Sequence, residues 1–200
     1  QQAFSKGHLS AKFAKLAYRC GESLRAEVYM HDEEGRTQAA PLRIEVVNAR
    51  GQIRFERELV VSASDAVQRV AVIDCPIDTE AAEIWLLRLR LEDAAGAVRN
   101  EYVFTANSEQ PLSSLRHADR AEVSLELDAS NRVITVTHAR GPAIVGGWIR
   151  LRDGEREPAV RFGVNHFTLL QGETVAVPYQ STVPIEVGDL VVEAFNVPCS

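Results

Sequence analysis

Strict alternation of apolar and polar residues limits the folds open to this chain more than any other feature. Residues 24–30, 42–46 and 85–91 each carry an apolar side chain at every second position. Successive side chains of a β-strand point to opposite faces, so each segment is predicted to be a strand with one buried and one solvent-facing side. No long segment has the i, i+3, i+4 apolar spacing of an amphipathic helix. The residues predicted to face a core are Leu24, Ala26, Val28, Met30, Leu42, Ile44, Val46, Trp85, Leu87, Leu89 and Leu91, with Arg88 and Arg90 on the solvent side.

Turn-forming residues divide the first half of the chain into short strands. Clusters rich in Gly, Asn, Asp and Pro supply the backbone conformations that tight turns require. About seven strands fit between Lys12 and Phe104, which is the strand number of an immunoglobulin-like sandwich. The turn clusters lie at residues 32–35, 48–51, 62–65, 75–78 and 92–96.

A polar segment at residues 105–120 separates two regions of alternation. It contains a proline and has no periodicity, as expected of a linker between domains. Alternation then resumes with a predicted hairpin and further short strands, enough for a second sandwich. The predicted fold class is all-β, with two tandem immunoglobulin-like antiparallel β-sandwiches. The predicted boundaries are an N-terminal extension at 1–11, a first sandwich at 12–108, a linker at 109–119 and a second sandwich at 120–200.

Charge and composition argue against several classes of partner. The chain is 46% apolar and 25% charged, as in ordinary globular proteins, and its formal net charge is −6. No basic surface is implied, so neither nucleic acid nor an anionic membrane is an expected partner. No apolar run approaches the ~20 residues that a membrane-spanning helix needs. The first ten residues, QQAFSKGHLS, lack both a starting Met and the organisation of a signal peptide, so we expect a piece of a longer protein.

The three cysteines, Cys20, Cys75 and Cys199, do not describe a disulfide scaffold or a zinc ribbon. Their number is odd, there is no C-x-x-C, and Trp85 follows Cys75 instead of lying between the first two cysteines as an immunoglobulin framework would require. We therefore expect reduced thiols in a reducing compartment. This favours the cytoplasm. A periplasmic or secreted location stays open, because an export signal would lie upstream of this piece.

Motifs for phosphate binding, dinucleotide binding, acyl transfer and metal-dependent proteolysis are all absent from the sequence. The densest group of potential metal ligands is HDEE at 31–34, which is interpreted as a solvated acidic turn, because a cation site needs several oxygens converging on one point. Glu101, in RNEY, is interpreted as a solvent-facing strand residue. Glycoside hydrolysis needs two carboxylates about 5–10 Å apart, and no partner for Glu101 is evident. The sequence therefore predicts no catalytic residue, no cofactor and no metal.

Trp148 and Tyr179 leave two interpretations open. Both could stack against sugars on the face of a sandwich, or both could pack in a core or between domains. Aromatic residues make up only 6% of the chain and do not cluster in the sequence, which favours packing.

Three segments together resemble the C-terminal immunoglobulin-like domains of β-mannosidase-type enzymes of glycoside hydrolase family 2. YRCGESLRAEVYMHDEEG at 18–35 resembles the start of one such domain, with Cys20 in place of a proline. EDAAGAVRNEYVF at 92–104, followed by Pro111 and Leu112, resembles its closing hairpin. VNHFTLLQGETVAV at 164–177 resembles the N-x-F-x-L-L-P-G-E phrase of the terminal domain. The matching residues there are Asn165, Phe167, Leu169, Leu170, Gly172 and Glu173, and Gln171 replaces the proline.

The resemblance implies that the chemistry resides elsewhere. In that family two Glu residues on a (β/α)₈ barrel act in a retaining mechanism, and a barrel needs about 250 residues. The resemblance therefore implies that this chain is a non-catalytic accessory part of a β-mannosidase-like glycosidase. The expected partner is the catalytic barrel of the same parent chain, with carbohydrate as a second candidate.

Two other functions stay open from the sequence. A free-standing pair of carbohydrate-binding modules would need a flat face with two or three exposed aromatic residues. An adhesion protein is disfavoured by the lack of repeats, of a sorting tail and of paired cysteines. The LLQGE phrase itself is interpreted as a turn that opens a core strand, and Gly172→Val is predicted to unfold the second domain and spare the first.

Overall fold

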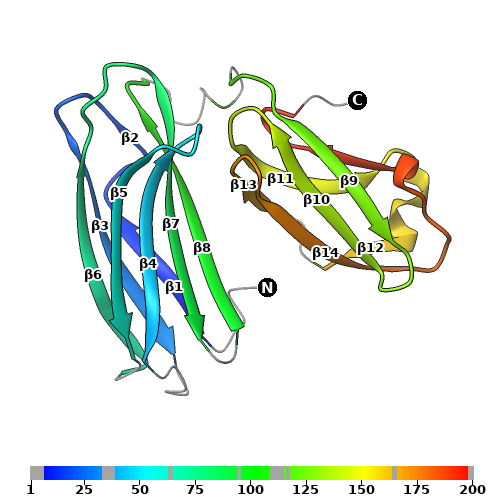
Figure 1. Cartoon of the computed structure of the whole chain (residues 1–200), viewed down its shortest axis with the longest axis horizontal. Helices are drawn as coiled ribbons and strands as arrows, with labels where there is room; N and C mark the ends of the chain where they lie inside the picture. Colours follow the sequence, from blue (N-terminus) through cyan, green and yellow to red (C-terminus); the bar gives the residue numbers. More distant parts are fainter. Residues whose placement is uncertain are drawn as a thin grey trace. The chain divides into compact units, whose positions relative to one another are not determined.

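A computed structural model describes residues 7–32, 39–62, 65–93, 96–108, 115, 118–163 and 166–197 (Figure 1). The chain divides into two compact units, Gln1–Ser114 and Leu115–Ser200. This division falls inside the segment 109–119 predicted as a linker. Each unit has its own cluster of buried apolar residues, so each is described by itself. None of the helices among the described residues is long and apolar enough to cross a membrane.

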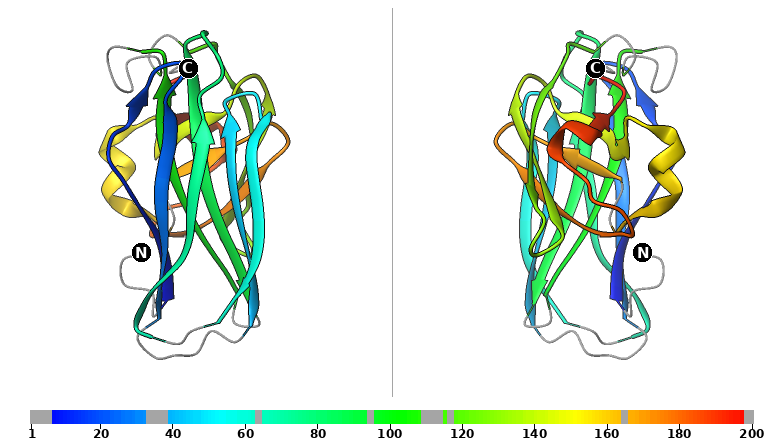
Figure 2. Two further views of the ribbon diagram at one scale, coloured as in Figure 1. Left: turned by 90° about the vertical axis from the view of Figure 1, so that its left-hand side faces the viewer. Right: turned by 90° about the vertical axis from the view of Figure 1, so that its right-hand side faces the viewer.

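The first unit is a sandwich of two β-sheets that lie face to face (Figure 2). All neighbouring strands pair antiparallel except β2 and β8, which pair parallel over two residues. One sheet has the order β1-β3-β6, from Gly7–Phe13, Ser23–Asp32 and Val67–Pro76. The other has the order β2-β8-β7-β4-β5, from Ala17–Tyr18, Gly96–Ala106, Glu83–Asp93, Ala40–Asn48 and Ile53–Val61.

Period-two alternation identified the core of this unit correctly. All eleven residues predicted to face inward are at most 3% exposed, and Phe104 joins them. The predicted all-β sandwich class is therefore confirmed. The cause is local, since the pleat of a strand sends every second side chain to the same face.

Two expectations about this unit need correction. Residues 7–11 belong to the sandwich, because β1 pairs with β3 along its whole length and Leu9 is buried. Gly7, Ser10 and Ala11 dilute the apolar pattern of this strand, which is why it was not predicted. Arg88 was placed on a solvent-facing side, yet it is only 5% exposed.

The second unit is a smaller sandwich. One sheet has the order β12-β14-β10-β9, from Val160–Phe162, Thr174–Ser181, Val133–Arg140 and Glu122–Asp128. The other has the order β13-β11-β15, from Phe167–Leu169, Ile144–Leu151 and Leu190–Glu193. The predicted hairpin is confirmed, since β9 pairs antiparallel with β10. The 3₁₀ helices η3 (Gly154–Ala159) and η4 (Val187–Asp189) lie between strands.

The LLQGE phrase forms a type II turn that leads into β14. Glu173 N–H donates to Leu170 O (2.9 Å), and Gly172 has φ = +82°. Gln171 is not among the described non-glycine residues with positive φ, which fixes the turn as type II. The Glu173 carboxylate accepts the Leu170 N–H (2.9 Å), and Gly172 N–H donates to His138 O (2.9 Å).

The YRCGE phrase before β3 repeats this geometry. Glu22 N–H donates to Arg19 O (3.0 Å), the Glu22 carboxylate accepts the Arg19 N–H (2.7 Å), and Gly21 has φ = +86°. Gly21 N–H donates to Ile77 O (2.9 Å), as the glycine of the other turn does to its own neighbouring strand. Each phrase is therefore a turn stabilised by its own Glu. Cys20 and its counterpart occupy the position at which type II turns favour proline.

We expect Gly172→Val to lower the stability of the second unit by about 1–2 kcal/mol, the cost of holding a residue with a Cβ at positive φ. This corresponds to roughly 4–16 °C in the melting temperature of a domain this size. A Cβ at position 172 meets no atom within 4 Å, so no steric clash adds to the strain. The expected loss is therefore smaller than the outright unfolding expected from the sequence, and the melting temperature of the variant decides between the two.

Thermal melting followed through the second unit tests this expectation. Gly188→Val is the matched control, because Gly188 also has open space around its Cβ position but no positive φ. Equal losses for the two variants would show that the backbone conformation of Gly172 is not the cause.

Candidate functional site

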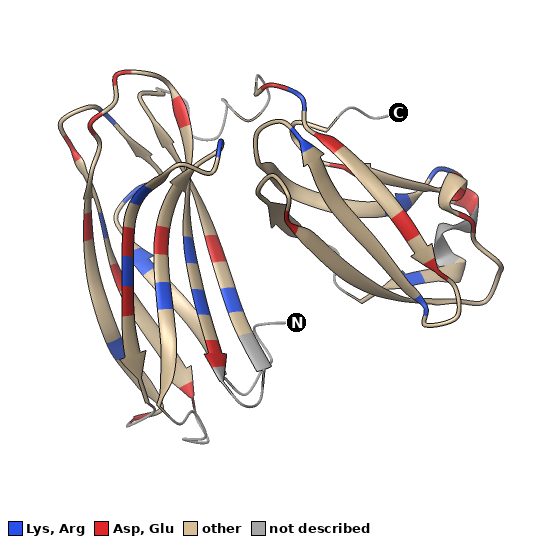
Figure 3. Ribbon diagram, viewed as in Figure 1, with Lys and Arg blue, Asp and Glu red and all other residues tan. Residues whose placement is uncertain are grey.

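Glu101, the residue that most resembled a catalytic acid, belongs to a buried ion cluster. It lies opposite Arg88 on β7, and its carboxylate pairs with the guanidinium Nε at 2.8 Å. Glu45, 6% exposed, lies opposite Arg88 from β4 on the other side. Figure 3 shows acidic and basic positions side by side on these strands.

Two carboxylates therefore lie on either side of one guanidinium, and Glu101 is paired with it. The strands that carry Glu45 and Glu101 lie about 10 Å apart across β7, a spacing that a pair of glycosidase carboxylates could have. Each carboxylate is paired with a guanidinium, Glu101 with Arg88 and Glu45 with Arg43 (3.0 Å). Glu101 is half-buried and paired, which corrects its placement as a simple solvent-facing residue.

The other residues of the RNEYVF phrase fasten the two sheets together. Asn100 Nδ2 donates to Leu9 O (2.8 Å) and to the Tyr102 hydroxyl (2.9 Å), and that hydroxyl accepts the Ala11 N–H (2.9 Å). Leu9 and Ala11 lie on β1, the edge strand of the other sheet. The polar residues of this phrase are structural: they satisfy backbone groups of a strand about 90 residues away.

The histidine of HDEE stacks on a second histidine. His31 lies opposite His8, with ring centroids 4.1 Å apart and planes 8° apart, and Ser10 Oγ lies 2.7 Å from His31 Nε2. Glu33 and Glu34 lie outside the described residues. Among the residues that the structure does describe, no three His, Cys, Asp or Glu side chains are grouped so as to hold a metal ion.

We expect acidification from about pH 7 to about pH 5 to destabilise the first unit through this histidine pair. Burial, and secondarily the charge of His8, lowers the pKa of His31 below its ordinary value of 6.5. The unfolded chain then binds a proton that the folded chain refuses, so stability falls as pH drops below 6.5 and levels off below the folded pKa.

The measurement is urea unfolding of the first unit at several pH values above 5, where Glu22 and Glu27 stay ionised because hydrogen bonds lower their pKa values. His31→Gln removes the titrating group and is expected to flatten the profile. An unchanged slope in this variant would show that other groups cause the pH dependence.

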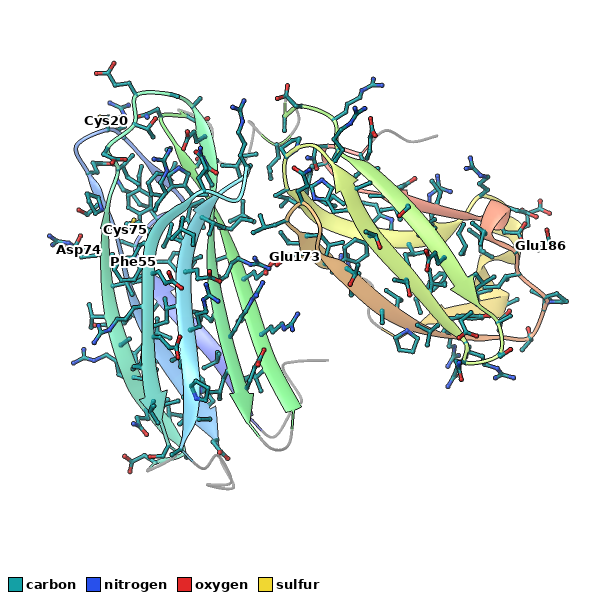
Figure 4. All side chains as sticks on the ribbon, viewed as in Figure 1. Cys20, Phe55, Asp74, Cys75, Glu173 and Glu186 are labelled. Atoms are coloured by element: carbon teal, nitrogen blue, oxygen red, sulfur yellow. The ribbon has the colours of Figure 1, made fainter. Side chains whose placement is uncertain are left out.

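The cysteines of the first unit differ in exposure. Cys20 is an exposed free thiol, whereas Cys75 lies inside the sandwich, where burial raises its pKa to about 11 (Figure 4). A thiol held protonated in this way is a poor nucleophile. Cys199 lies outside the described residues.

The structure separates the two aromatic residues that sequence reasoning treated alike. Tyr179 is 8% exposed and belongs to the core of the second unit. Trp148 is half-buried on the outer face of β11, where its ring meets that of His166 edge to face at 6.1 Å. Phe195, 54% exposed, was missed altogether. The sequence carries no signal for it, because its exposure depends on its neighbour across the sheet.

A shallow depression of about 350 Å³ lies at one end of the larger sheet of the second unit. Its lining offers guanidinium, amide and hydroxyl groups but no carboxylate or imidazole, so it holds no general acid–base pair. The lining residues are Arg132, Ala159, Arg161, Gln180, Ser181 and Thr182.

Comparison with known proteins shows similarity of fold alone. No protein-family model matches this sequence. No curated protein matches it either. Among solved structures, β-D-mannosidase from Dictyoglomus thermophilum aligns with a TM-score of 0.62 at 11% identity, over 98% of this chain and 22% of that chain.

Two further structures align with lower TM-scores, which carry no weight for function. They are a β-glucuronidase from Parabacteroides merdae (TM-score 0.34, 12% identity, 60% of this chain and 14% of that chain) and α-2-macroglobulin from Salmonella (TM-score 0.38, 16% identity, 94% and 12%). This chain spans less than a quarter of the length of each of these proteins.

Proposed function

We propose that the two units are non-catalytic accessory domains of a glycoside hydrolase. The observation that carries this proposal is the fold similarity to a β-mannosidase, which extends over 98% of this chain but only 22% of that enzyme. A chain that corresponds to a minor part of an enzyme is expected to support its catalytic part. The family resemblance of the Gly-Glu turns and the RNEYVF phrase points to the same class of protein.

The side chains of this chain support a structural role. The strongest catalytic candidate, Glu101, is held by Arg88, and the tyrosine and asparagine beside it close the sandwich. A (β/α)₈ barrel of about 250 residues would have to come from another part of the parent protein. In the proposed parent, that barrel hydrolyses terminal β-mannosides with retention, and the two sandwiches brace it.

Activity measurements on the purified chain test the non-catalytic assignment. We expect no turnover of nitrophenyl β-mannoside, β-glucoside or β-galactoside above the buffer rate. A Glu101→Gln variant serves as the control: activity in the chain that this variant removes would overturn the proposal.

The coding sequence on either side of this chain tests the assignment to a parent enzyme. We expect a barrel-length segment with two suitably placed Glu residues in the same reading frame. A complete parent protein without such a segment would overturn the accessory role.

A further inference from the structure

The outer face of β11 and the chain just past β15 carry two aromatic side chains, Trp148 and Phe195. Trp148 lies opposite Glu193 in the antiparallel register, and the chain continues past β15 to Phe195, whose N–H donates to Val145 O (3.5 Å). A Cβ built on Gly146 would lie 3.1 Å from Phe195 Cε2, so the ring of Phe195 lies across the bare backbone of Gly146. The register of β11 shifts between Ile144 and Gly147, but the Cβ position of Gly147 meets the core residue Phe167 whereas that of Gly146 meets Phe195. Gly146 and Trp148 therefore lie on the face opposite to Gly147.

Polar groups border these rings. The imidazole of His166 meets the Trp148 ring, and Arg150, two residues further along β11, pairs with Glu193 through its guanidinium Nε. We call Trp148, His166 and Phe195 the aromatic patch, and the Arg150–Glu193 pair its rim. The patch combines flat apolar surface with hydrogen-bonding groups at its edge.

The size of the aromatic patch argues against a protein partner. An aromatic side chain buries about 150–250 Å² at most, so the two large rings offer less than about 500 Å² even if fully covered. A stable protein interface buries about 800 Å² on each partner. A small amphipathic ligand fits better. A pyranose ring has an apolar face of C–H groups that stacks on an aromatic ring, and a circumference of hydroxyl groups that hydrogen-bond to charged side chains.

We propose that the aromatic patch binds a neutral β-linked hexose chain, with one sugar ring stacked on Phe195 and the next beside Trp148. The choice of β-mannosides as the ligand rests on the proposed function, whereas the stacking surface does not. In the parent enzyme such a site holds the polysaccharide chain close to the barrel and leaves the chemistry to the barrel.

Fluorescence titration of the full chain with β-1,4-mannotriose tests the proposal. The chain has two tryptophans, and Trp85 is 1% exposed, so a response reports on Trp148. We expect a saturable change with a Kd on the order of 1 mM. Maltotriose, which is α-linked, is the comparison ligand and is expected to bind more weakly. The absence of any saturable change with either sugar would overturn the proposal.

Variants at Phe195 separate stacking from general apolar contact. Phe195→Leu keeps an apolar side chain but removes the ring, and is expected to weaken binding about 2–12-fold. Phe195→Tyr keeps the ring and is expected to bind like the original chain. Val187→Ala is the control, because Val187 is also exposed (44%) but lies in η4. Equal affinities for Phe195→Leu and Phe195→Tyr, with both folded by circular dichroism, would contradict stacking.

Sedimentation of the same variants tests whether the aromatic patch is instead an interface between copies of the protein. Dimerisation that Phe195→Leu abolishes, together with no response to sugar, would identify the patch as a protein interface and overturn sugar binding. Failure of sugar binding can be told apart from failure of the proposed function. Turnover by the chain itself would refute the accessory role without changing the titration, and a failed titration would leave the accessory role standing.

Discussion

Arg88→Met is expected to destabilise the first unit by about 3–5 kcal/mol, because it removes the cation that is paired with Glu101 and lies opposite the buried Glu45, whose remaining partner is Arg43. Glu45 and Glu101 lie on either side of Arg88, which is 5% exposed, and the pairing distance to Glu101 is 2.8 Å. Methionine has similar length and is apolar, so the loss arises from the charge. The free energy of unfolding in urea measures it, read through Trp85 in a Trp148→Phe background.

The matched control is Arg25→Met, in the same unit. Arg25 pairs with Asp74 at the same 2.8 Å, but the two side chains are 76% and 50% exposed, and Asp74 points away from the sandwich (Figure 4). Exposed pairs contribute about 0–1 kcal/mol, so little change is expected. The triple variant Arg88→Met, Glu45→Gln, Glu101→Gln is expected to recover part of the loss. Similar losses of stability for Arg88→Met and Arg25→Met would show that burial does not determine how much the ion cluster contributes to stability.

Gly147→Val is expected to destabilise the second unit by about 1–3 kcal/mol by overpacking its core. A Cβ on Gly147 would lie 2.5 Å from Phe167 Cε2 and 3.1 Å from Ile144 Cγ2, both in the core. Valine has a higher β-propensity than glycine, so propensity alone predicts a gain in stability. The sign of the change therefore distinguishes packing from propensity.

Calorimetric melting measures this effect, with roughly 4–8 °C expected for each kcal/mol lost in a domain of this size. Gly154→Val is the control, since its Cβ position has no neighbour within 4 Å. Adding Phe167→Leu to Gly147→Val is expected to restore part of the melting temperature. A stabilised Gly147→Val variant would mean that the ring of Phe167 moves aside without cost.

Local patterns predicted the strands and the turns well. The alternation around Trp85 and Leu87 identified the inner face, because the pleat of a strand makes facing a property of neighbouring residues. The Gly-Glu phrases could likewise be interpreted as turns without a structure. The hydrogen bonds that close the turns, from Glu173 N–H to Leu170 O and from Glu22 N–H to Arg19 O, join residues only three positions apart, and the positive φ of Gly172 is a property of one residue.

Features that depend on distant partners could not be predicted. Nothing near Arg88 in the sequence shows that Glu45 lies opposite it, so its burial was missed. Tyr179 and Trp148 are equally isolated in the sequence, and only the register of their strands sends one into the core and the other to the surface.

The sequence by itself determined that this chain is all-β, where most of its strands run, which faces are apolar, and that its conspicuous phrases are turns. Only the tertiary structure decided that Glu101 is held in an ion cluster, that Tyr102 fastens β1, and that Phe195 lies exposed across Gly146. The physical reason is the range of the interactions. Strand periodicity and turn geometry arise within a few residues, whereas ion pairing, sheet closure and an exposed aromatic surface arise from the register of strands that lie far apart in the chain.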